Sequence, residues 1–155
     1  MEFSALVRAI EADTSDAALA LRLAPAQWQR LAGQMQRREL HPGDLLIRRA
    51  DIERAAYLVE RGHLQVFVSG GPAGSHRIST LRAGTLVGES SWFSALPRMA
   101  SVEATTSCIV WALSAERLAL LAADDPRLAL ALLQAAGALM VQRVRAHQER
   151  GLPWA

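Results

Sequence analysis

Short apolar runs that alternate with glycine-containing turns fill the middle of this chain, between residues 35 and 113. Each run is bounded by glycine, proline or polar residues and is shorter than an ordinary helix. Repeated short strands with tight turns are typical of antiparallel sandwiches and barrels. We expect strands over residues 45–47, 56–59, 64–68, 78–81, from 102 onward, and 107–113.

Helical periodicity lies on both sides of this region. Apolar residues between Phe3 and Ile10 have the i, i+3, i+4, i+7 spacing of an amphipathic helix. A short second helix is predicted over residues 17–23, and a third helix from Pro25 to about Gly33. The sequence therefore predicts an N-terminal helical segment over residues 1–34 and a β domain over residues 35–113.

The C-terminal segment, residues 114–155, is predicted to be helical as well. Ser114 is a good N-cap for a helix that ends near residue 123. Asp125 followed by Pro126 is a strong start for a second helix, which continues to about residue 148. Helices on both flanks of a strand-rich centre define an α+β domain.

The last helix is apolar on nearly every face between residues 128 and 141, so more than one side of it must be covered. We expect one stripe to face the β domain and the other to face a second copy of the chain or another helix. The run is too short to cross a bilayer, and no membrane insertion is expected. The two stripes are Leu128, Leu132, Ala135 and Leu139, and Leu130, Leu133, Gly137, Met140 and Val144.

Charge and cysteine content exclude some classes of function. The formal net charge is +2, which is too small to indicate a nucleic-acid surface. Cys108 is the single cysteine and lies in an apolar run, so it is expected to be a buried thiol in a reducing, cytoplasmic compartment. The four histidines are scattered without metal-ligand spacing, so no metal site and no catalytic residue is predicted.

The stretch from Leu86 to Val102 carries the most specific chemistry. Gly88 and Glu89 precede Arg98 by a short loop. A guanidinium group binds a phosphate through two parallel charge-assisted hydrogen bonds, and a carboxylate accepts a hydrogen bond from a ribose hydroxyl. The spacing therefore suits a buried sugar phosphate with one negative charge. The simpler alternative is a salt bridge between Glu89 and Arg98.

Three motifs in the chain together resemble the cyclic-nucleotide-binding domain family. The resemblance covers roughly residues 31–145, and it implies an antiparallel β jelly-roll (a double-stranded β-helix) with a phosphate-binding cassette over about residues 84–102 and a C-terminal lid helix. The motifs are Pro42-Gly43-Asp44, Tyr57-Leu58-Val59 with Gly62, and Gly84 with Gly88-Glu89, Pro97-Arg98 and Ala100-Ser101-Val102.

By this resemblance, the ligand is cAMP or cGMP, and its binding moves the C-terminal helix. Members with a hydroxyl after the cassette arginine favour guanine, so Met99 at that position favours cAMP. The implied ligand contacts are Gly88, Glu89, Ser90, Ser91, Arg98, Met99 and Ala100. The candidates for covering the base are Leu139, Met140 and Arg143.

Two other functions remain open on the sequence. One is a metal-dependent jelly-roll enzyme, which the scattered histidines do not favour. The other is a dimerisation or docking scaffold of the same family that no longer binds nucleotide, which Met99 favours and Glu89 with Arg98 disfavours. We expect no DNA binding by this chain alone, because no helix-turn-helix motif follows the long helix.

Overall fold

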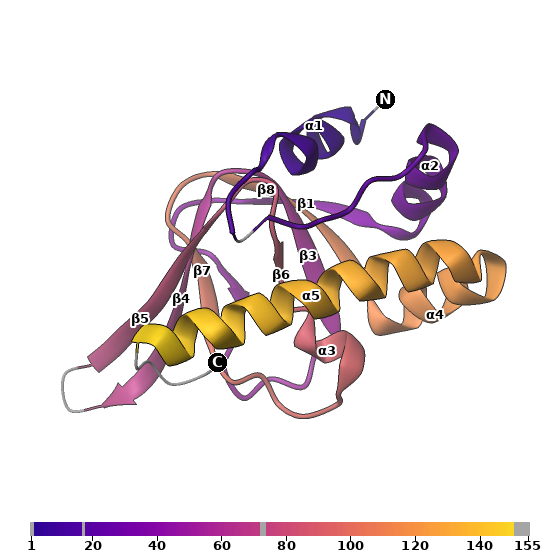
Figure 1. Ribbon diagram of the computed structural model, residues 1–155. Helices are drawn as coiled ribbons and strands as arrows, with labels where there is room; N and C mark the ends of the chain where they lie inside the picture. The colour runs from indigo at the N-terminus through magenta and orange to yellow at the C-terminus, as the bar shows by residue number, and fades with distance from the viewer. Residues whose placement is uncertain (1, 17, 72–73, 151–155) are drawn as a thin grey trace.

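The computed structural model describes residues 2–16, 18–71 and 74–150, and it folds into two four-stranded sheets flanked by helices (Figure 1). The helices are α1 (Ser4–Ala12), α2 (Pro25–Gln34), α3 (Ser90–Phe93), α4 (Ala115–Asp124) and α5 (Pro126–Arg150). The strands are β1 (Gln36–Leu40), β2 (Leu45–Ile47), β3 (Ala55–Arg61), β4 (His63–Gly71), β5 (Gly74–Arg82), β6 (Leu86–Val87), β7 (Ser101–Ala104) and β8 (Cys108–Ser114).

Both sheets are antiparallel throughout the described pairings. The first has the order β1-β8-β3-β6 and the second the order β2-β7-β4-β5. Apart from the β4–β5 hairpin, neighbouring strands in each sheet are not consecutive in sequence, which is the connectivity of a jelly-roll. The predicted α+β fold, with N-terminal helices and a long C-terminal helix, is confirmed.

The unbroken apolar runs of β3 and β8 are explained by two separate cores. Side chains that alternate along a strand point to opposite faces of its sheet. In β3, Tyr57 and Val59 face the interior of the barrel, whereas Ala56 and Leu58 face the layer of helices. In β8 the same alternation places Val110 inside the barrel and residues such as Trp111 under the helices. Because the first sheet is covered on both sides, both faces of these strands are apolar.

The N-terminal segment differs from prediction in one place. Residues 18–24 form neither helix nor strand, and only residue 17 of the predicted helix lies outside the described residues. Leu19 and Leu21 are buried while Ala20 and Arg22 are exposed, so burial alternates with the period of two of an extended segment. Packing of the alternating leucines against the helical core outweighs the helix propensity of the alanines between them.

Two strands were not predicted. β1 is polar, and β6 has two residues; each lies at an edge of the first sheet. The charged residues of β1 include the Arg37–Glu39 ion pair, with 2.8 Å between Arg37 Nη1 and Glu39 Oε1. Edge strands carry such charges because they prevent further strand addition, and this composition hides the strand from a hydrophobic-pattern analysis.

The caps predicted for the C-terminal helices are present. The Ser114 hydroxyl accepts a hydrogen bond from the Arg117 N–H at 3.1 Å, and Asp125 Oδ1 accepts one from the Leu128 N–H at 3.1 Å. The α4 helix packs on both α5 and α2, and α1 packs on β3. The α5 helix begins among these helices and continues past them to the second sheet (Figure 1).

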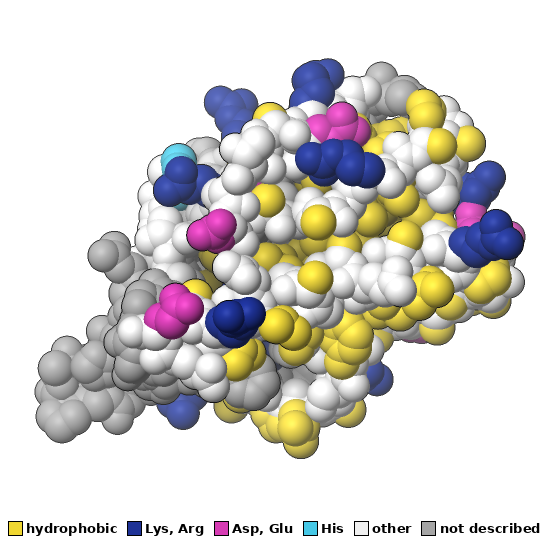
Figure 2. Space-filling view, in the orientation of Figure 1, with side chains coloured by type: hydrophobic (Ala, Val, Ile, Leu, Met, Phe, Trp, Pro, Cys, Tyr) yellow, Lys and Arg dark blue, Asp and Glu magenta, His cyan; other side chains and the backbone are white. Residues whose placement is uncertain are grey.

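One face of α5 is core and another is exposed. Its stripe of Leu128, Leu132, Ala135 and Leu139 is buried in the helical core. On other faces, Leu130 is 56% exposed and Val141 is 61% exposed, and Figure 2 shows apolar side chains gathered along the outer side of this helix. By length and composition α5 resembles a membrane span, but its buried stripe accounts for much of its apolar content.

Candidate functional site

A cavity of about 590 Å³ lies between the cassette, the second sheet and the last turns of α5. Its size is within the range of small-molecule sites, and polar groups converge on a partly apolar lining. Eight of the residues singled out from the sequence line it: Gly88, Glu89, Ser90, Arg98, Met99, Ala100, Met140 and Arg143.

Gly88 fixes the shape of the cassette turn. Its φ of +80° belongs to the left-handed region that glycine adopts without strain. A Cβ atom at this position would lie 2.8 Å from Ile47 Cδ1, 3.1 Å from the Ala55 carbonyl oxygen and 3.1 Å from Arg98 Nη1. The absence of a side chain therefore lets the Arg98 guanidinium group approach the backbone of the turn.

Arg98 is buried but has no acidic partner. Its side chain is 8% exposed; Nη1 donates to the Gly88 carbonyl at 2.8 Å, and Nη2 donates to the Ala55 carbonyl. Its Nε–H is buried without a hydrogen-bond partner. Among the residues that the structure describes, no carboxylate lies within ion-pair distance of this group. Burial lowers the pKa of Arg98 from its usual value, because the charged form loses solvation.

The backbone of Arg98 is also fixed. Its N–H donates to the Asp51 carbonyl at 2.8 Å, and its carbonyl accepts from the Ala50 N–H at 2.8 Å. These two bonds join the cassette loop to the loop between β2 and β3. The position of the guanidinium group is thus set from both ends, by its backbone and by its carbonyl acceptors.

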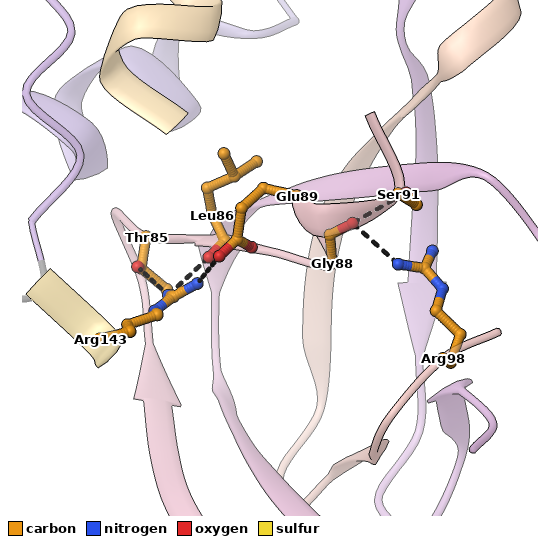
Figure 3. Close-up of polar contacts among 7 residues, drawn as sticks. All are labelled: Thr85, Leu86, Gly88, Glu89, Ser91, Arg98 and Arg143. Carbon is orange, nitrogen blue, oxygen red and sulfur yellow. Dashed lines mark hydrogen bonds and ion pairs between the residues drawn. The ribbon is translucent and has the colours of Figure 1, made fainter. Parts of the chain in front are cut away.

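Glu89 pairs with Arg143 and not with Arg98. Its side chain is 9% exposed, and Oε1 lies 2.8 Å from Arg143 Nη1. Arg143 Nη2 also donates to the Thr85 hydroxyl at 3.0 Å and to the Leu86 carbonyl at 2.6 Å. Figure 3 shows the two guanidinium groups on either side of the Gly88–Glu89 turn. The anticipated alternative, a Glu89–Arg98 salt bridge, does not form.

Arg143 therefore connects the lid helix to the cassette. It comes from the last turns of α5, whereas all three of its acceptors come from the segment between β5 and α3. The sequence singled out Arg143 as a residue that covers the base. In the structure its guanidinium group holds the carboxylate expected to bind the ribose, and its role in covering the base stays a prediction. Thr85 was not foreseen as a partner.

Two of the expected site residues do not line the cavity. The Ser91 hydroxyl donates to the carbonyls of Ala55 and Gly88, at 3.1 and 2.9 Å. These hydrogen bonds stabilise the cassette turn. Leu139 is packed in the helical core, because it lies on the buried stripe of α5. Met99 lines the cavity, and its side chain is 46% exposed.

The structure adds residues that the sequence did not single out. Thr80 of β5 and His147 of α5 also line the cavity, and His147 is buried. The Ala55 carbonyl accepts from both Arg98 and Ser91. A backbone acceptor has no sequence signature, so no pattern predicts its role. Within the described part of the chain, no group of three or more His, Cys, Asp or Glu side chains is arranged to hold a metal ion.

Comparison with known proteins identifies the family. A sequence profile described as "Cyclic nucleotide-binding domain" matches residues 37–125, more than half of the chain. The chain belongs to the cyclic nucleotide-binding domain family. The match begins in β1 and ends just before α5, so it includes both Glu89 and Arg98.

A curated relative is a cAMP-dependent protein kinase regulatory subunit from Blastocladiella emersonii. It is 31% identical over 87 residues, which cover 56% of this chain and 22% of the relative. The chain thus matches about a fifth of that protein's length. The similarity leaves most of the relative unmatched.

Two solved structures resemble this cyclic nucleotide-binding domain. A cyclic nucleotide-binding domain from Methylobacillus flagellatus has a TM-score of 0.83 and 23% identity, covering 96% of this chain and 82% of that one. The catabolite activator protein of Thermus thermophilus has a TM-score of 0.73 and 26% identity, covering 88% of this chain and 61% of that one. Domains of this family are typically non-catalytic and regulatory.

Proposed function

We propose that this chain is a non-enzymatic regulatory domain that binds a 3′,5′-cyclic nucleotide, with cAMP as its ligand. The observation that carries the proposal is Arg98, a buried guanidinium group that lines a cavity without a carboxylate partner among the described residues. Burying an unpaired charge is costly, so such a group is a good binding site for an anion. The cyclic phosphate has one negative charge and meets this need.

Each polar group of the cassette has a role in this proposal. Arg98 holds the cyclic phosphate, and its unpartnered Nε–H provides a donor beyond those used on Gly88 and Ala55. Glu89 accepts a hydrogen bond from the ribose 2′-hydroxyl. Met140 covers the base from α5, since it lines the cavity beside Arg143. The absence of a hydroxyl at Met99 and the name of the kinase relative support cAMP over cGMP.

We infer that signalling works through the Arg143 contact. In this structure Arg143 holds Glu89, the same carboxylate that we assign to the ribose. A ligand changes a conformational equilibrium only by making different contacts in the two states. A ribose hydroxyl that competes for Glu89 weakens the contact that ties the last turns of α5 to the cassette, and the helix is released.

The exposed stripe of α5 supports self-association. Leu130 is 56% exposed, and Leu133, Met140 and Val144 on the same stripe are only partly buried. We propose that this stripe pairs with the same stripe of a second copy. Light scattering of the purified chain at high concentration is expected to give a dimer, and Leu130→Glu is expected to give a monomer. A monomer for both proteins contradicts this proposal.

A cytoplasmic location accords with this proposed function. Cys108 is a free, buried thiol, and burial raises its pKa, so it is expected to remain reduced. A free thiol fits a reducing compartment.

Calorimetric titration with cAMP and cGMP tests the proposal. We expect saturable binding of cAMP, weaker binding of cGMP, and loss of both in Arg98→Gln. Arg127→Gln removes the same charge from an exposed position outside the cavity and is expected to bind as the unchanged chain does. A folded chain that binds neither nucleotide contradicts the proposal and favours the docking scaffold.

A further inference from the structure

A second cavity, of about 960 Å³, lies behind the cassette. It is bounded by the junction of α2 and β1, the start of β3, the end of β8 and the first turns of α4. Trp92 of α3 and Ala55 of β3 form part of its wall. Ser90, from the same short helix as Trp92, lines the first cavity. The two cavities therefore meet different residues of this short helix, and nothing in the proposed nucleotide site uses the second one.

Part of the lining of the second cavity is apolar. Trp92 is buried there, and Met35 and Ala115 are partly buried beside it. The Trp92 ring is fixed, because its Nε1–H donates to the Leu113 carbonyl at 2.9 Å. Trp92 is 8% exposed, so the part of this fixed ring that lines the cavity gives a ligand an aromatic contact.

Three guanidinium groups line the same cavity. Arg54 Nε donates to the Ser91 carbonyl at 3.0 Å, and Arg117 Nη1 lies 3.4 Å from Gln34 Oε1. Arg38 lies over the Tyr57 ring, with its Cζ 5.5 Å from the ring centroid. Among the described residues, none of the three forms an ion pair with a carboxylate.

Two acidic residues, Glu53 and Glu116, line the cavity as well. Glu53 accepts a hydrogen bond from the Tyr57 hydroxyl at 3.0 Å, and burial with Glu53 nearby raises the pKa of Tyr57 to about 12, so this hydroxyl remains a donor. Glu116 lies in the first turn of α4, where a negative charge offsets the positive end of the helix dipole. The lining therefore has three positive and two negative side chains, and both glutamates have other interactions. This excess of positive charge suits an anion.

We propose that this second cavity is a binding site for a small organic anion with a flat apolar body, such as an aromatic phosphate or carboxylate. The apolar body lies on Trp92, and the anionic group faces Arg54 and Arg117. Arginine binds phosphate and carboxylate groups through paired hydrogen bonds, and both side chains retain N–H donors for them.

Phenyl phosphate is the probe for this site. Calorimetry is done with the whole chain at saturating cAMP, and the Trp92 indole signal is followed by NMR. We expect phenyl phosphate to bind and to shift the Trp92 signal. Benzylamine, which has the same ring and the opposite charge, is expected not to bind, and inorganic phosphate, which lacks the ring, is expected to bind at least tenfold more weakly.

Matched variants locate the binding. Arg54→Gln with Arg117→Gln is expected to weaken phenyl phosphate binding at least tenfold, and Arg127→Gln by less than twofold. Because Arg54 contacts the cassette, Arg117→Gln alone is a second variant, and it is expected to weaken binding about threefold or more. Unchanged affinity in both cavity variants overturns the proposal.

The outcome does not depend on the nucleotide site. Arg98→Gln is expected to bind phenyl phosphate as the unchanged chain does, and loss of binding in this variant assigns the probe to the cassette and overturns the proposal. If cAMP does not bind but phenyl phosphate does, and the Arg54 and Arg117 dependence holds, the proposed function fails and the second site stands. If cAMP binds and phenyl phosphate does not, the second site fails and the proposed function stands.

Discussion

Arg98 and Arg143 line the same cavity, but their surroundings are opposite. Arg98 lies in the cassette and is held by carbonyl oxygens, with no acidic partner among the described residues. Arg143 lies on α5 and is already paired with Glu89. A charge that is buried without an opposite charge gains most from an incoming anion, and a charge that is already paired gains least. In the proposed function, this difference is the reason for assigning Arg98 to the ligand and Arg143 to control of its access.

The largest effect is expected for Arg98→Ala. This variant leaves the cyclic phosphate buried without its partner, at a cost of about 3–5 kcal/mol. Because ~1.4 kcal/mol corresponds to a tenfold change, cAMP affinity falls by about two to three powers of ten. Arg98→Lys is expected to restore part of it, since lysine keeps the charge and loses the paired geometry. Wild-type affinity in a folded Arg98→Ala protein, measured by calorimetry, places the phosphate elsewhere.

A smaller loss is expected for Glu89→Gln. One charge-assisted hydrogen bond contributes roughly 1.5–3 kcal/mol, so cAMP affinity falls by about tenfold to a hundredfold. The same variant is expected to discriminate less between cAMP and 2′-deoxy-cAMP. Glu39→Gln, at an exposed position on β1, is the control and is expected to change neither value. If Glu89→Gln discriminates between cAMP and 2′-deoxy-cAMP as well as the unchanged chain does, the Glu89 carboxylate does not bind the ribose.

Arg143→Gln is expected to act in the opposite direction. It removes the contacts of Arg143 with Glu89, Thr85 and Leu86, so the nucleotide has less to displace and binds about tenfold more tightly. Hydrogen exchange in the last turns of α5 is expected to become faster. Arg145 lines the same cavity without these contacts, so Arg145→Gln is the control. Weaker cAMP binding by Arg143→Gln would mean that Arg143 contacts the nucleotide, as Arg98 does, and would contradict the different roles assigned to the two arginines.

The smallest effect is expected for Met140→Ala. The substitution removes apolar surface that we assign to covering the base, and each buried methylene group contributes about 0.8 kcal/mol. We expect cAMP affinity to fall by about threefold to tenfold. Val141→Ala, one residue along the same helix and 61% exposed, is expected to leave it unchanged. Equal affinities for the two variants show that Met140 does not cover the base.

The sequence predicted those parts of the fold that depend on local pattern. Turns at glycine and proline separated the apolar strands, and the caps Ser114 and Asp125 marked the starts of α4 and α5. It did not predict β1, because an edge strand is selected to be polar. It predicted a helix over residues 17–23, whereas the structure has no helix over residues 18–24 and buries Leu19 and Leu21 in alternation with exposed neighbours.

Part of the candidate site was accessible in the same way. Glu89 and Arg98 were singled out by their spacing in the cassette, and the structure places both in the cavity lining. The contact between Glu89 and Arg143 joins residues that are 54 positions apart, and it depends on where α5 passes over the cassette. The Ala55 carbonyl contributes through its backbone alone. Neither contact leaves a local pattern in the sequence.

The alternation along β3 makes the chain unusually sensitive to length changes at one place. Odd-numbered residues of this strand, such as Tyr57, pack in the barrel core, and even-numbered ones, such as Leu58, pack in the core beneath the helices. One residue inserted after Ala55 exchanges these two sets, so each core receives side chains of the wrong size. A point substitution in β3 removes the contacts of one side chain, whereas a one-residue insertion reverses the facing of every residue that follows it in the strand. We therefore expect such insertions to be absent from natural relatives and from the functional members of mutational libraries.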